Sequence, residues 1–427
     1  MAPAAAVAFP MTPAGEQASW LQTAMAHPPI PVAQIEAHFD SAFLDQVPAA
    51  EVSSESAEIG PLRLVSVTTS QASGIVFLAS ASAAKEYRVT LVVDGQGLIA
   101  GLTFVNVVVG TGPTTWAGVD AAVRSAAPDA HLLVSRLSGR RGSCQPVHAI
   151  SPATPAPLGS AFKLYVLDAL AADIAAGKVN WGQMITITNQ VKSLPSGVLQ
   201  NEPAGTKLSV LDVAAQMISI SDNTAADMLI GLVGRAAVEA AIRNAGMADP
   251  SLDTPFLTTR EMFVLKLHDW PLLANSYLAL RTSGERDAFI AKYVDTVPRS
   301  SLLAPAALWG TPRDVNSIEW FASAQDMCRA YASLLTYSER PGLSDLAKVL
   351  EINDGGLGLS PGQWKYTWFK GGSEPGVLTL DYLATTVSGQ TYVVSVLVMD
   401  TYGTISNATT FSLLSAIKGA FELAARS

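Results

Sequence analysis

Cysteine is scarce in this sequence. Among 427 residues only Cys144 and Cys328 are cysteines, and their spacing is not that of a zinc site. Two cysteines are too few for the disulfide scaffold of a small secreted domain. The two cysteines could form one disulfide or remain as two buried thiols, and the sequence favours the thiols. We expect no metal ion and no cofactor.

Histidine is also sparse. A hydrolase of the Ser-His-Asp type needs a histidine held beside its serine. No such arrangement is suggested by the positions of the five histidines, and we expect each to be structural: His27, His38, His131, His148 and His268.

The chain lacks an excess of basic residues and any long apolar run. Lys and Arg number 27 against 36 Asp and Glu, which gives a formal net charge of -9. Binding to nucleic acid phosphates needs a basic face, so this class of partner is excluded. No run of eighteen apolar residues occurs, so no membrane span is expected. We expect a small-molecule substrate, and the oligomeric state stays open.

The first residues leave the localisation open. The stretch "MAPAAAVAFPMTPAG" is small and apolar but lacks the basic region and the full apolar region of a signal peptide. It fits a bacterial-type exported protein whose signal peptide is absent from this chain, and it equally fits a cytoplasmic chain.

Length and composition predict two globular domains. The apolar content of 49% and the charged content of 15% are typical of folded proteins, and 427 residues exceed one ordinary core. The "GTGP" stretch at 110–113 breaks the pattern and marks the boundary. We therefore expect a flexible tail over 1–13, a small α+β domain over 14–112 and a larger domain over 113–427.

The small domain begins with helical periodicity over 16–26 and 31–47 and then changes period. Short β-branched runs at 63–70, 74–82 and 87–105, with a "DGQG" turn, predict antiparallel hairpins. Two helices followed by a curled sheet form an α+β domain. His38 and Asp40 are two residues apart and do not face each other on a helix, so we interpret both as surface residues. A structural or docking role is expected.

The larger domain shows strands at both ends and helices between them. A helix at 115–127 and strands at 131–139 and 146–152 come first, and mostly helical patterns continue to about residue 336. Strands return at 366–373, 377–387 and 391–400 before a last helix at 408–427. This order predicts one sheet built from both ends, a separate helical lobe and a cleft between them.

The stretch "PLGSAFKLYVLDAL" predicts a buried helix whose first turn carries Ser160 and Lys163 on one face. A serine at a helix start is usually an N-cap. A lysine in an apolar turn, however, is unfavourable unless it is paired or neutral. A neutral lysine one turn away can remove the proton of a serine hydroxyl and make the serine a nucleophile.

Two further stretches carry polar side chains in unusual places. In "SISDNTAADML", Ser221 and Asn223 interrupt a helical pattern, which alone indicates a helix N-cap. In "WFKGGSEPG", a strand carries Lys370 and ends in Gly371 and Gly372, which alone indicates a charged edge strand running into a turn.

In this order the three stretches resemble the S-x-x-K, S-D-N and K-T-G motifs of the serine β-lactamase and penicillin-binding family. The segments "EPAGTKLSVLDVAAQMISISDNTAADMLI" and "AAVEAAIRNAGM" are also similar to helices of that family. The resemblance covers about residues 115 to 427. It implies an α/β fold of the class A type, in which a mixed sheet with helices on both faces lies beside an all-helical lobe.

The resemblance also implies roles for the motif residues. Ser160 would be the acylated nucleophile and Lys163 its base or proton relay. Ser221 would pass a proton to the leaving group. Asn223 would hold the amide of the substrate, and Lys370 would supply positive charge near the substrate carboxylate.

The oxyanion hole and the carboxylate contact depend on the last motif. The backbone N–H groups of Ser160 and Ser373 would form the oxyanion hole, with Gly372 lining the substrate site. The family has Thr or Ser after the lysine, whereas this chain has Gly371, so one hydroxyl contact to the substrate is missing. Ser373 is the candidate to replace that hydroxyl.

The deacylation motif of class A enzymes, E-x-x-L-N, is absent. The corresponding region reads "TPFLTTREMFVLKLHDW", and Glu261 is the only carboxylate in reach by sequence. Its context favours a first-turn residue that interacts with the helix dipole over a catalytic base. We therefore expect slow deacylation.

The combination resembles two-domain β-lactamase-like esterases of the kind associated with clavulanic acid biosynthesis, in which a small cystatin- or steroid-isomerase-like domain comes first. The expected activity is weak β-lactamase or cephalosporin-type esterase activity through an acyl-enzyme at Ser160. The alternatives are a cell-wall D,D-peptidase and a β-lactam-binding sensor or sink without turnover. The presence of Lys163, Ser221 and Lys370 together favours an enzyme.

Overall fold

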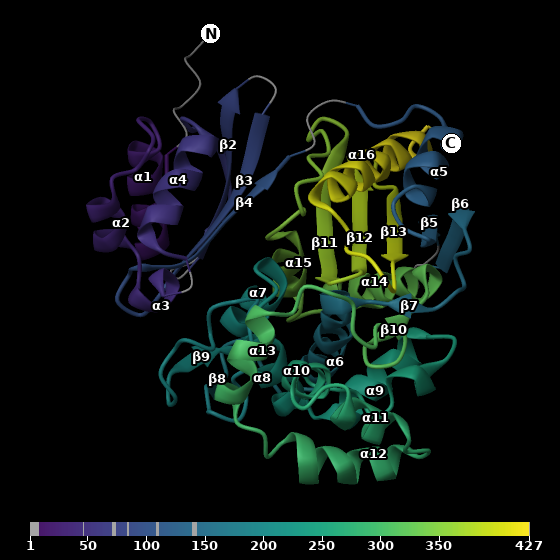
Figure 1. Ribbon diagram of the computed structural model, residues 1–427. Coiled ribbons are helices and arrows are strands. Elements are labelled where there is room, and N and C mark those ends of the chain that lie inside the picture. Colours follow the sequence, from purple (N-terminus) through teal and green to yellow (C-terminus); the bar gives the residue numbers. More distant parts are fainter. Residues whose placement is uncertain are drawn as a thin grey trace. The chain divides into compact units, whose positions relative to one another are not determined.

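The computed structural model describes residues 8–45, 47–70, 74–82, 85–107, 111–138 and 143–426. The chain divides into two compact units, Met1–Gly110 and Thr111–Ser427 (Figure 1). The boundary expected after residue 112 falls two residues beyond this division. Among the described residues, no helix is both long and apolar enough to cross a membrane.

The first unit consists of helices followed by a four-stranded antiparallel sheet in the order β1-β2-β3-β4. Apolar residues of the helices and of one sheet face form its core, among them Leu21, Ile35, Phe77 and Leu91. The elements are α1 (Pro13–Ala24), α2 (Val32–His38), α3 (Ser41–Leu44), α4 (Ala49–Ile59), β1 (Arg63–Ser70), β2 (Gly74–Ser82), β3 (Lys85–Val93) and β4 (Ile99–Asn106).

Two expectations for the first unit are wrong in detail. Four helices precede the sheet instead of two, because the helix expected over 31–47 is divided into α2 and α3 and the serine-rich segment before β1 forms α4. Its buried face carries Val52 and Ser56, and the Ser56 hydroxyl accepts a hydrogen bond from the backbone of Ile30. The expected tail over 1–13 is too long, since the ring of Phe9 packs edge-on against Phe77.

His38 and Asp40 are not plain surface residues either. The His38 ring stacks on Trp20 with ring centroids 3.8 Å apart, and its Nδ1 lies 2.9 Å from Gln17 Oε1. Asp40 lies beyond the end of α2 and caps α3 by accepting a hydrogen bond from the Phe43 backbone. Both side chains are half-buried and serve local structure, which the two-residue spacing alone does not reveal.

The second unit is built on a five-stranded sheet in the order β11-β12-β13-β5-β6. The strands come from both ends of the unit, as the sequence predicts: β5 (Asp129–Ser138), β6 (Ser143–Ile150), β11 (Trp364–Glu374), β12 (Val377–Thr386) and β13 (Thr391–Met399). Each neighbouring pair is antiparallel, so the expectation of a mixed sheet is wrong. Short connections join β11 to β12 and β12 to β13, and such hairpins make antiparallel pairs.

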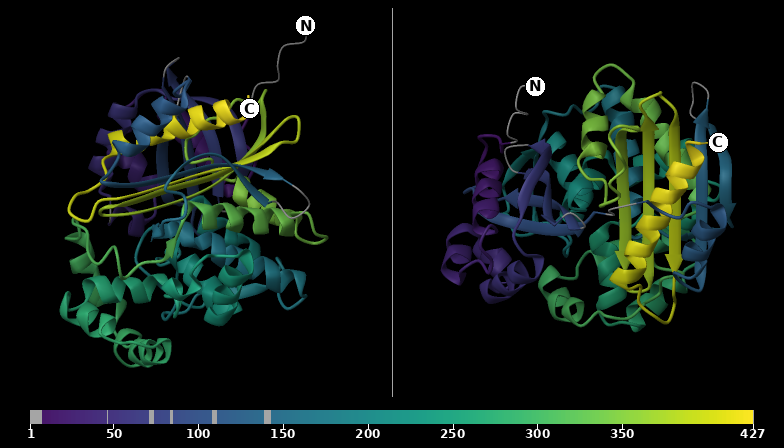
Figure 2. Two further views of the ribbon diagram at one scale, coloured as in Figure 1. Left: turned by 90° about the vertical axis from the view of Figure 1, so that its right-hand side faces the viewer. Right: turned by 90° about the horizontal axis from the view of Figure 1, so that it is seen from above.

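Helices cover both faces of this sheet (Figure 2). On one face lie α5 (Trp116–Arg124) and α16 (Asn407–Ala424), and α14 (Ala324–Ser338) packs against the other. The remaining helices are α6 (Lys163–Ala175), α7 (Val210–Ser219), α8 (Asn223–Val233), α9 (Arg235–Ala245), α10 (Thr259–Leu267), α11 (Leu272–Leu278), α12 (Ser283–Phe289), α13 (Leu303–Ala307) and α15 (Ser344–Glu351). Both β12 and β13 are almost wholly buried, as expected for a sheet covered on both faces.

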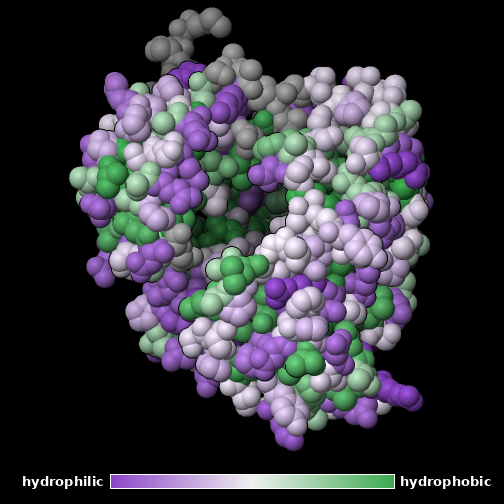
Figure 3. Space-filling model, viewed as in Figure 1, coloured by the Kyte–Doolittle hydropathy of each residue, from purple (hydrophilic) through white to green (hydrophobic). Residues whose placement is uncertain are grey.

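Short elements connect the sheet to the helical part. Strand β7 (Ala156–Pro157) pairs with β10 (Phe321–Ala322), and β8 (Met184–Thr186) pairs with β9 (Lys207–Ser209). Single turns of 3₁₀ helix occur at Gly159–Phe162, Pro250–Asp253 and Arg299–Leu302, and a π-helical turn occurs at Ile290–Val294. The first of these turns carries Ser160. On the face shown in Figure 3, hydrophilic and hydrophobic residues are interspersed over both units.

The two cysteines form a disulfide, so the preference for two buried thiols is wrong. Cys144 on β6 and Cys328 on α14 have Cα atoms 6.3 Å apart, within the range that a disulfide bridges. They are 184 residues apart in sequence, and the pairing depends on α14 packing across the sheet beside β6. Sequence spacing carries no signal for that contact.

Removing this disulfide is expected to destabilise the second unit. A cross-link over so long a loop restricts the unfolded chain, and disulfides of this kind contribute about 2–4 kcal/mol. The double variant Cys144→Ala, Cys328→Ala should unfold at a lower temperature than the wild type in a thermal melt. Reductant should lower the wild-type melting temperature and leave that of the variant unchanged. Equal melting temperatures for the two proteins without reductant would contradict this expectation.

Candidate active site

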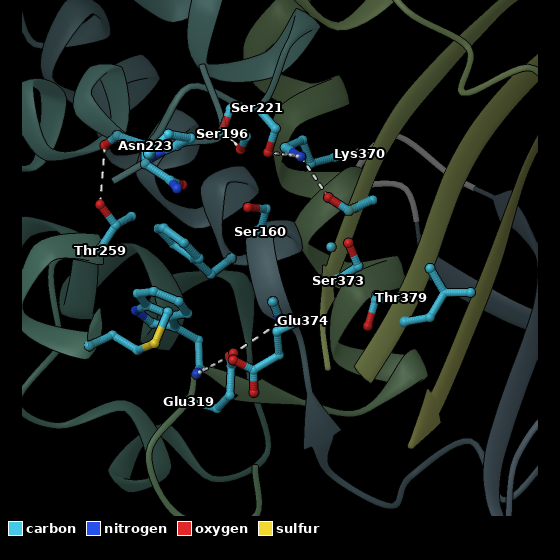
Figure 4. A pocket seen from close by; sticks show the side chains of 18 of the residues that line it. Ser160, Ser196, Ser221, Asn223, Thr259, Glu319, Lys370, Ser373, Glu374 and Thr379 are labelled. Carbon is cyan, nitrogen blue, oxygen red and sulfur yellow. Dashed lines mark hydrogen bonds between the residues drawn. The ribbon is translucent and has the colours of Figure 1, made fainter. Parts of the chain in front are cut away.

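Ser160 lies at the centre of a cavity of about 480 Å³ in the second unit (Figure 4). It belongs to the 3₁₀ turn that precedes α6, so it is not the N-cap of that helix. The cavity wall includes the turn at Gly159–Phe162, residues 195–223, the start of α10, residues 319–320 before β10, and strands β11 and β12. The three sequence motifs thus meet around one hydroxyl group.

Lys163 is completely buried beneath Ser160. Its Nζ lies 3.0 Å from Ser160 Oγ, 3.1 Å from Ser221 Oγ and 2.7 Å from Asn223 Oδ1, and it also donates to the Ser221 carbonyl. The amine therefore joins the first motif to the second and contacts both hydroxyl groups.

Burial lowers the pKa of Lys163 well below its ordinary value, and the positive charge of Lys370 lowers it further. The carboxylates of Asp222 and Asp227 act in the opposite direction. A lowered pKa favours the neutral form of the amine over the ammonium form. In the neutral form its nitrogen has a lone pair that can accept the proton of Ser160.

Ser221 has a left-handed backbone conformation, with φ of 59°. This conformation is unfavourable for a residue with a Cβ atom and is typical of functional sites when the surroundings maintain it. Here the Ser221 carbonyl accepts hydrogen bonds from Ser196 Oγ at 2.8 Å and from Lys163. The Ser221 hydroxyl then lies between two amines, 3.1 Å from Lys163 Nζ and 3.0 Å from Lys370 Nζ.

Asp222 and Asn223 fix the loop that carries Ser221. Asp222 is fully buried; it caps α8 through the Ala225 N–H and accepts two more backbone bonds, from Val198 and Leu199. The Asn223 carboxamide accepts from Lys163 and donates to the Leu194 carbonyl at 3.1 Å. One N–H of this carboxamide remains available, so the expected contact with a substrate amide is compatible with the geometry.

Lys370 lies on β11 with its side chain buried, and its amine donates a hydrogen bond to Ser221 Oγ. Burial lowers its pKa to about 7, and the carboxyl of Asp381, directly opposite on β12, acts in the opposite direction. Burial raises the pKa of Asp381 to about 7, against a hydrogen bond from Ser395 and the charge of Lys370. The Ser221 hydroxyl therefore lies within hydrogen-bond distance of two amines, those of Lys163 and Lys370, and the pKa values of both are lowered.

Glycines allow β11 to approach the Ser160 turn closely. A Cβ atom on Gly372 would lie 2.0 Å from the Leu158 carbonyl oxygen and 2.5 Å from the Ser160 nitrogen. A Cβ on Gly159, whose φ is 48°, would lie 2.8 Å from the Ser373 nitrogen. The backbone nitrogens of Ser160 and Ser373 thus border the same close contact, where the sequence predicts an oxyanion hole.

Glu261 does not line the cavity. It is the third residue of α10 and part of a capping box. One carboxylate oxygen accepts a hydrogen bond from the Thr258 N–H at 2.7 Å, and the other accepts one from the Arg235 guanidinium at 2.6 Å. Both oxygens are used by local structure. This placement fits the first-turn role that the sequence favours.

Sequence reasoning missed several residues of the cavity. Ser196, Glu319 and Glu374 line it and belong to none of the three motifs. Only Glu374 had a signal, because it directly follows Ser373 on a strand whose Lys370 already faces the site. Glu319 reaches the site through the pairing of β10 with β7, which places its carboxylate on the Gly159 N–H at 3.2 Å.

Two parts of the chain match the sequence models of known families. Residues 143–336 match the sequence model of a family described as the β-lactamase enzyme family, a range that includes Ser160, Lys163 and Ser221. This part of the chain is similar in sequence to the β-lactamase family. Residues 9–99 match a second family, described as the ORF 12 gene product N-terminal domain. No curated protein matches the chain in sequence.

Solved structures also resemble this chain. A β-lactamase from Sphaerobacter thermophilus has a TM-score of 0.50 and 21% identity, covering 73% of this chain and 97% of that one. At this identity the likeness shows a shared class A-like fold. A β-lactamase from Chitinophaga pinensis has a TM-score of 0.48 and 19% identity, covering 72% and 98%. A PBP-A variant, solved as an acyl-enzyme complex with penicillin G, has a TM-score of 0.47 and 17% identity, covering 74% of this chain and 98% of that one.

The buried amine of Lys370 should make the stability of the protein depend on pH. Its folded pKa of about 7 lies below the ordinary 10.5, so the unfolded state binds more protons between these values and stability should rise with pH across them. Lys370→Met should have a higher urea midpoint than the wild type at pH 7, and the difference should narrow towards pH 10.

The control for this measurement is Lys348→Met, because the Lys348 side chain is 76% exposed. It should leave the pH dependence of the urea midpoint unchanged. A constant difference between Lys370→Met and the wild type from pH 7 to pH 10 would contradict the buried-amine account.

Proposed function

We propose that the second unit is a serine hydrolase that forms an acyl-enzyme at Ser160 with a β-lactam or a related ester or amide. The observation that carries the proposal is the position of Lys163: its buried Nζ contacts Ser160 Oγ at 3.0 Å and Ser221 Oγ at 3.1 Å. A nucleophile, its base and a proton relay are thus in mutual hydrogen-bond reach.

In this mechanism neutral Lys163 accepts the proton of Ser160 as Oγ attacks the carbonyl carbon of the substrate. The developing negative charge on the carbonyl oxygen is stabilised by the N–H groups of Ser160 and Ser373. The proton then passes from Lys163 through the Ser221 hydroxyl to the leaving nitrogen or oxygen. Lys370 keeps the Ser221 hydroxyl oriented through its 3.0 Å contact.

Substrate binding uses polar groups of the cavity that take no part in the proton transfers. Asn223 would donate its free N–H to an amide carbonyl of the substrate. The Ser373 side chain is exposed at the cavity and replaces the hydroxyl that Gly371 lacks, so it would contact the substrate carboxylate. Residues from both sides of Ser160 then hold an acylamino carboxylate of the β-lactam type.

We further propose weak β-lactamase or cephalosporin-type esterase activity with slow deacylation. Both carboxylate oxygens of Glu261 are used by Thr258 and Arg235, so the position where class A enzymes activate water has no free base. The two family matches in this order along the chain support the two-domain esterase subtype as the closest description.

The acyl-enzyme is tested by intact mass. Wild-type protein incubated with a penicillin or a cephalosporin should gain the mass of the acyl group within minutes and lose it slowly. Ser160→Ala should gain no mass, whereas Ser276→Ala, which changes an exposed serine on α11, should react like the wild type. A mass increase that persists in Ser160→Ala would overturn the assignment of the nucleophile.

The base is tested by the rate of the same reaction. Lys163→Met should slow acylation at least 100-fold, because general base catalysis contributes about 10²- to 10⁴-fold. An unchanged acylation rate would exclude Lys163 as the base. Release of D-Ala from a D-Ala-D-Ala peptide without any β-lactam adduct would instead favour the D,D-peptidase alternative, and an adduct that never decays would favour a sensor or sink.

A further inference from the structure

One side of the active-site cavity is lined by apolar side chains that the proton transfers do not use. Met262 and Phe263 on α10, Trp309 after α13 and Trp320 before β10 all line the cavity. Three of these residues are buried, whereas Trp309 is half-buried. We call these four residues the apolar wall.

The indole groups of the apolar wall use their N–H groups within the protein. Trp320 Nε1 donates a hydrogen bond to the Leu257 carbonyl at 2.9 Å, and Trp309 Nε1 donates one to the Thr311 carbonyl at 3.0 Å. An indole has a single N–H and no acceptor, so neither ring has a further polar group for a ligand. The wall therefore favours an apolar occupant.

The ring of Trp309 is held in place by its neighbours. It meets Phe263 edge to face, with ring centroids 6.0 Å apart and an angle of 84° between the planes. The Lys266 Nζ lies 5.8 Å from the centre of the same ring and pairs with Glu374 at 2.5 Å and Glu319 at 3.8 Å. A ring that is already fixed loses little conformational entropy when a ligand packs against it.

The apolar wall and the proton relay lie on opposite sides of the nucleophile. Glu319 is on the side of Ser160 that faces away from Ser221 and Lys370 (Figure 4). Trp320 directly follows Glu319, and its backbone N–H donates to Glu319 Oε2 at 2.9 Å. The wall therefore begins on the side of Ser160 that the leaving group does not occupy.

The proposed mechanism decides which part of a substrate faces this wall. Ser221 passes its proton to the leaving nitrogen or oxygen, and Ser221 is bonded to Lys370. The leaving group and the acyl chain are attached to the carbonyl carbon by different bonds, so they diverge from Ser160 Oγ. With the leaving group towards Ser221, the acyl chain points towards the apolar wall.

Helix α10 gives a second reason for the same direction. Thr259, its first residue, donates a hydrogen bond to the carbonyl of Asn223 at 3.3 Å. Met262 and Phe263 follow Thr259 by three and four residues, which places the three side chains on one helix face, and all three line the cavity. A substituent whose amide is bound by Asn223 therefore continues along α10 towards Trp309.

The apolar wall offers no cation to an anionic substituent. Among the described residues that line the cavity, Lys370 alone has a cationic side chain, and it lies on the other side of Ser160. Lys266 lies behind the wall and is fully buried between the carboxyl groups of Glu319 and Glu374. A carboxylate against the wall would lose its water without gaining a partner, which is unfavourable.

We propose that the apolar wall binds an uncharged aryl substituent of the acyl group and that Trp309 is the residue that determines this specificity. The inference rests on the proposed acyl-enzyme at Ser160 and narrows its substrates to aryl-substituted acyl compounds. An aryl ring suits the wall because aromatic pairs gain free energy beyond the area that they bury.

The test compares three penicillins with the same nucleus. Benzylpenicillin carries an uncharged aryl group, carbenicillin carries the same group with an added carboxylate, and 6-acetamidopenicillanic acid keeps the amide but has no aryl group. The rate of adduct formation is measured by intact mass at drug concentrations far below saturation. The wild type should react at least about 10-fold faster with benzylpenicillin than with either of the others.

The role of Trp309 is tested with the same compounds. Trp309→Ala should react about 10-fold more slowly than the wild type with benzylpenicillin and at an unchanged rate with 6-acetamidopenicillanic acid. A merely structural role of the ring would slow both reactions equally. The control is Leu308→Ala, because Leu308 is 82% exposed and does not line the cavity, and it should react like the wild type with all three compounds.

The outcomes separate this inference from the proposed function. Equal rates of the wild type with the three penicillins overturn the inference and leave the acyl-enzyme in place, and this comparison does not depend on the folding of any variant. An equal loss with both compounds in Trp309→Ala overturns the role of Trp309. Absence of any adduct in the wild type overturns the proposed function, and the inference with it.

Discussion

The amine of Lys163 has no exposed surface, so it must find its hydrogen-bond partners within the protein. Its four oxygen partners come from the Ser160 turn and the Ser221–Asn223 loop. Asp222 holds that loop in place through three backbone N–H groups, and Ser221 accepts an unfavourable backbone conformation as a result. Burial of one amine thus accounts for the backbone strain at Ser221 and for the lowered pKa of Lys163.

Close approach of backbone segments is the second constraint. Strand β11 brings Lys370 to the Ser221 hydroxyl and brings the Ser373 N–H to the Ser160 turn, and glycine at 372 is required because any side chain would collide with Leu158 and Ser160. The β7–β10 pair fixes the same turn from the other side and carries Glu319 to the Gly159 N–H. The positions of the Ser373 N–H, the Ser221 hydroxyl contact and the Glu319 carboxyl therefore all depend on how these strands meet.

The sequence predicts much of this arrangement. The pairs Ser160–Lys163 and Ser221–Asn223 are local patterns, and strands at both ends of the unit are evident from their β-branched runs, so these features can be predicted. The disulfide between Cys144 and Cys328, the contact of Glu319 with Gly159 and the pairing of Glu374 with Lys266 cannot. They join residues 108 to 184 positions apart and depend on tertiary packing. Helix α4 is not evident from the sequence, because only Val52 and Ser56 of its residues are buried and such a short pattern gives little helical periodicity.

The most direct test of the account is the titration of Lys163 itself. Protein labelled with ¹³C at the lysine ε carbon, with the Lys163 signal assigned by its loss in a Lys163→Met variant, can be followed by NMR from pH 5 to pH 11. The account predicts that this signal titrates with a midpoint well below the ordinary 10.5, because burial and the Lys370 charge both disfavour the ammonium form. A midpoint at or above 10.5 would contradict it, since Lys163 would then remain charged and could not accept the proton of Ser160.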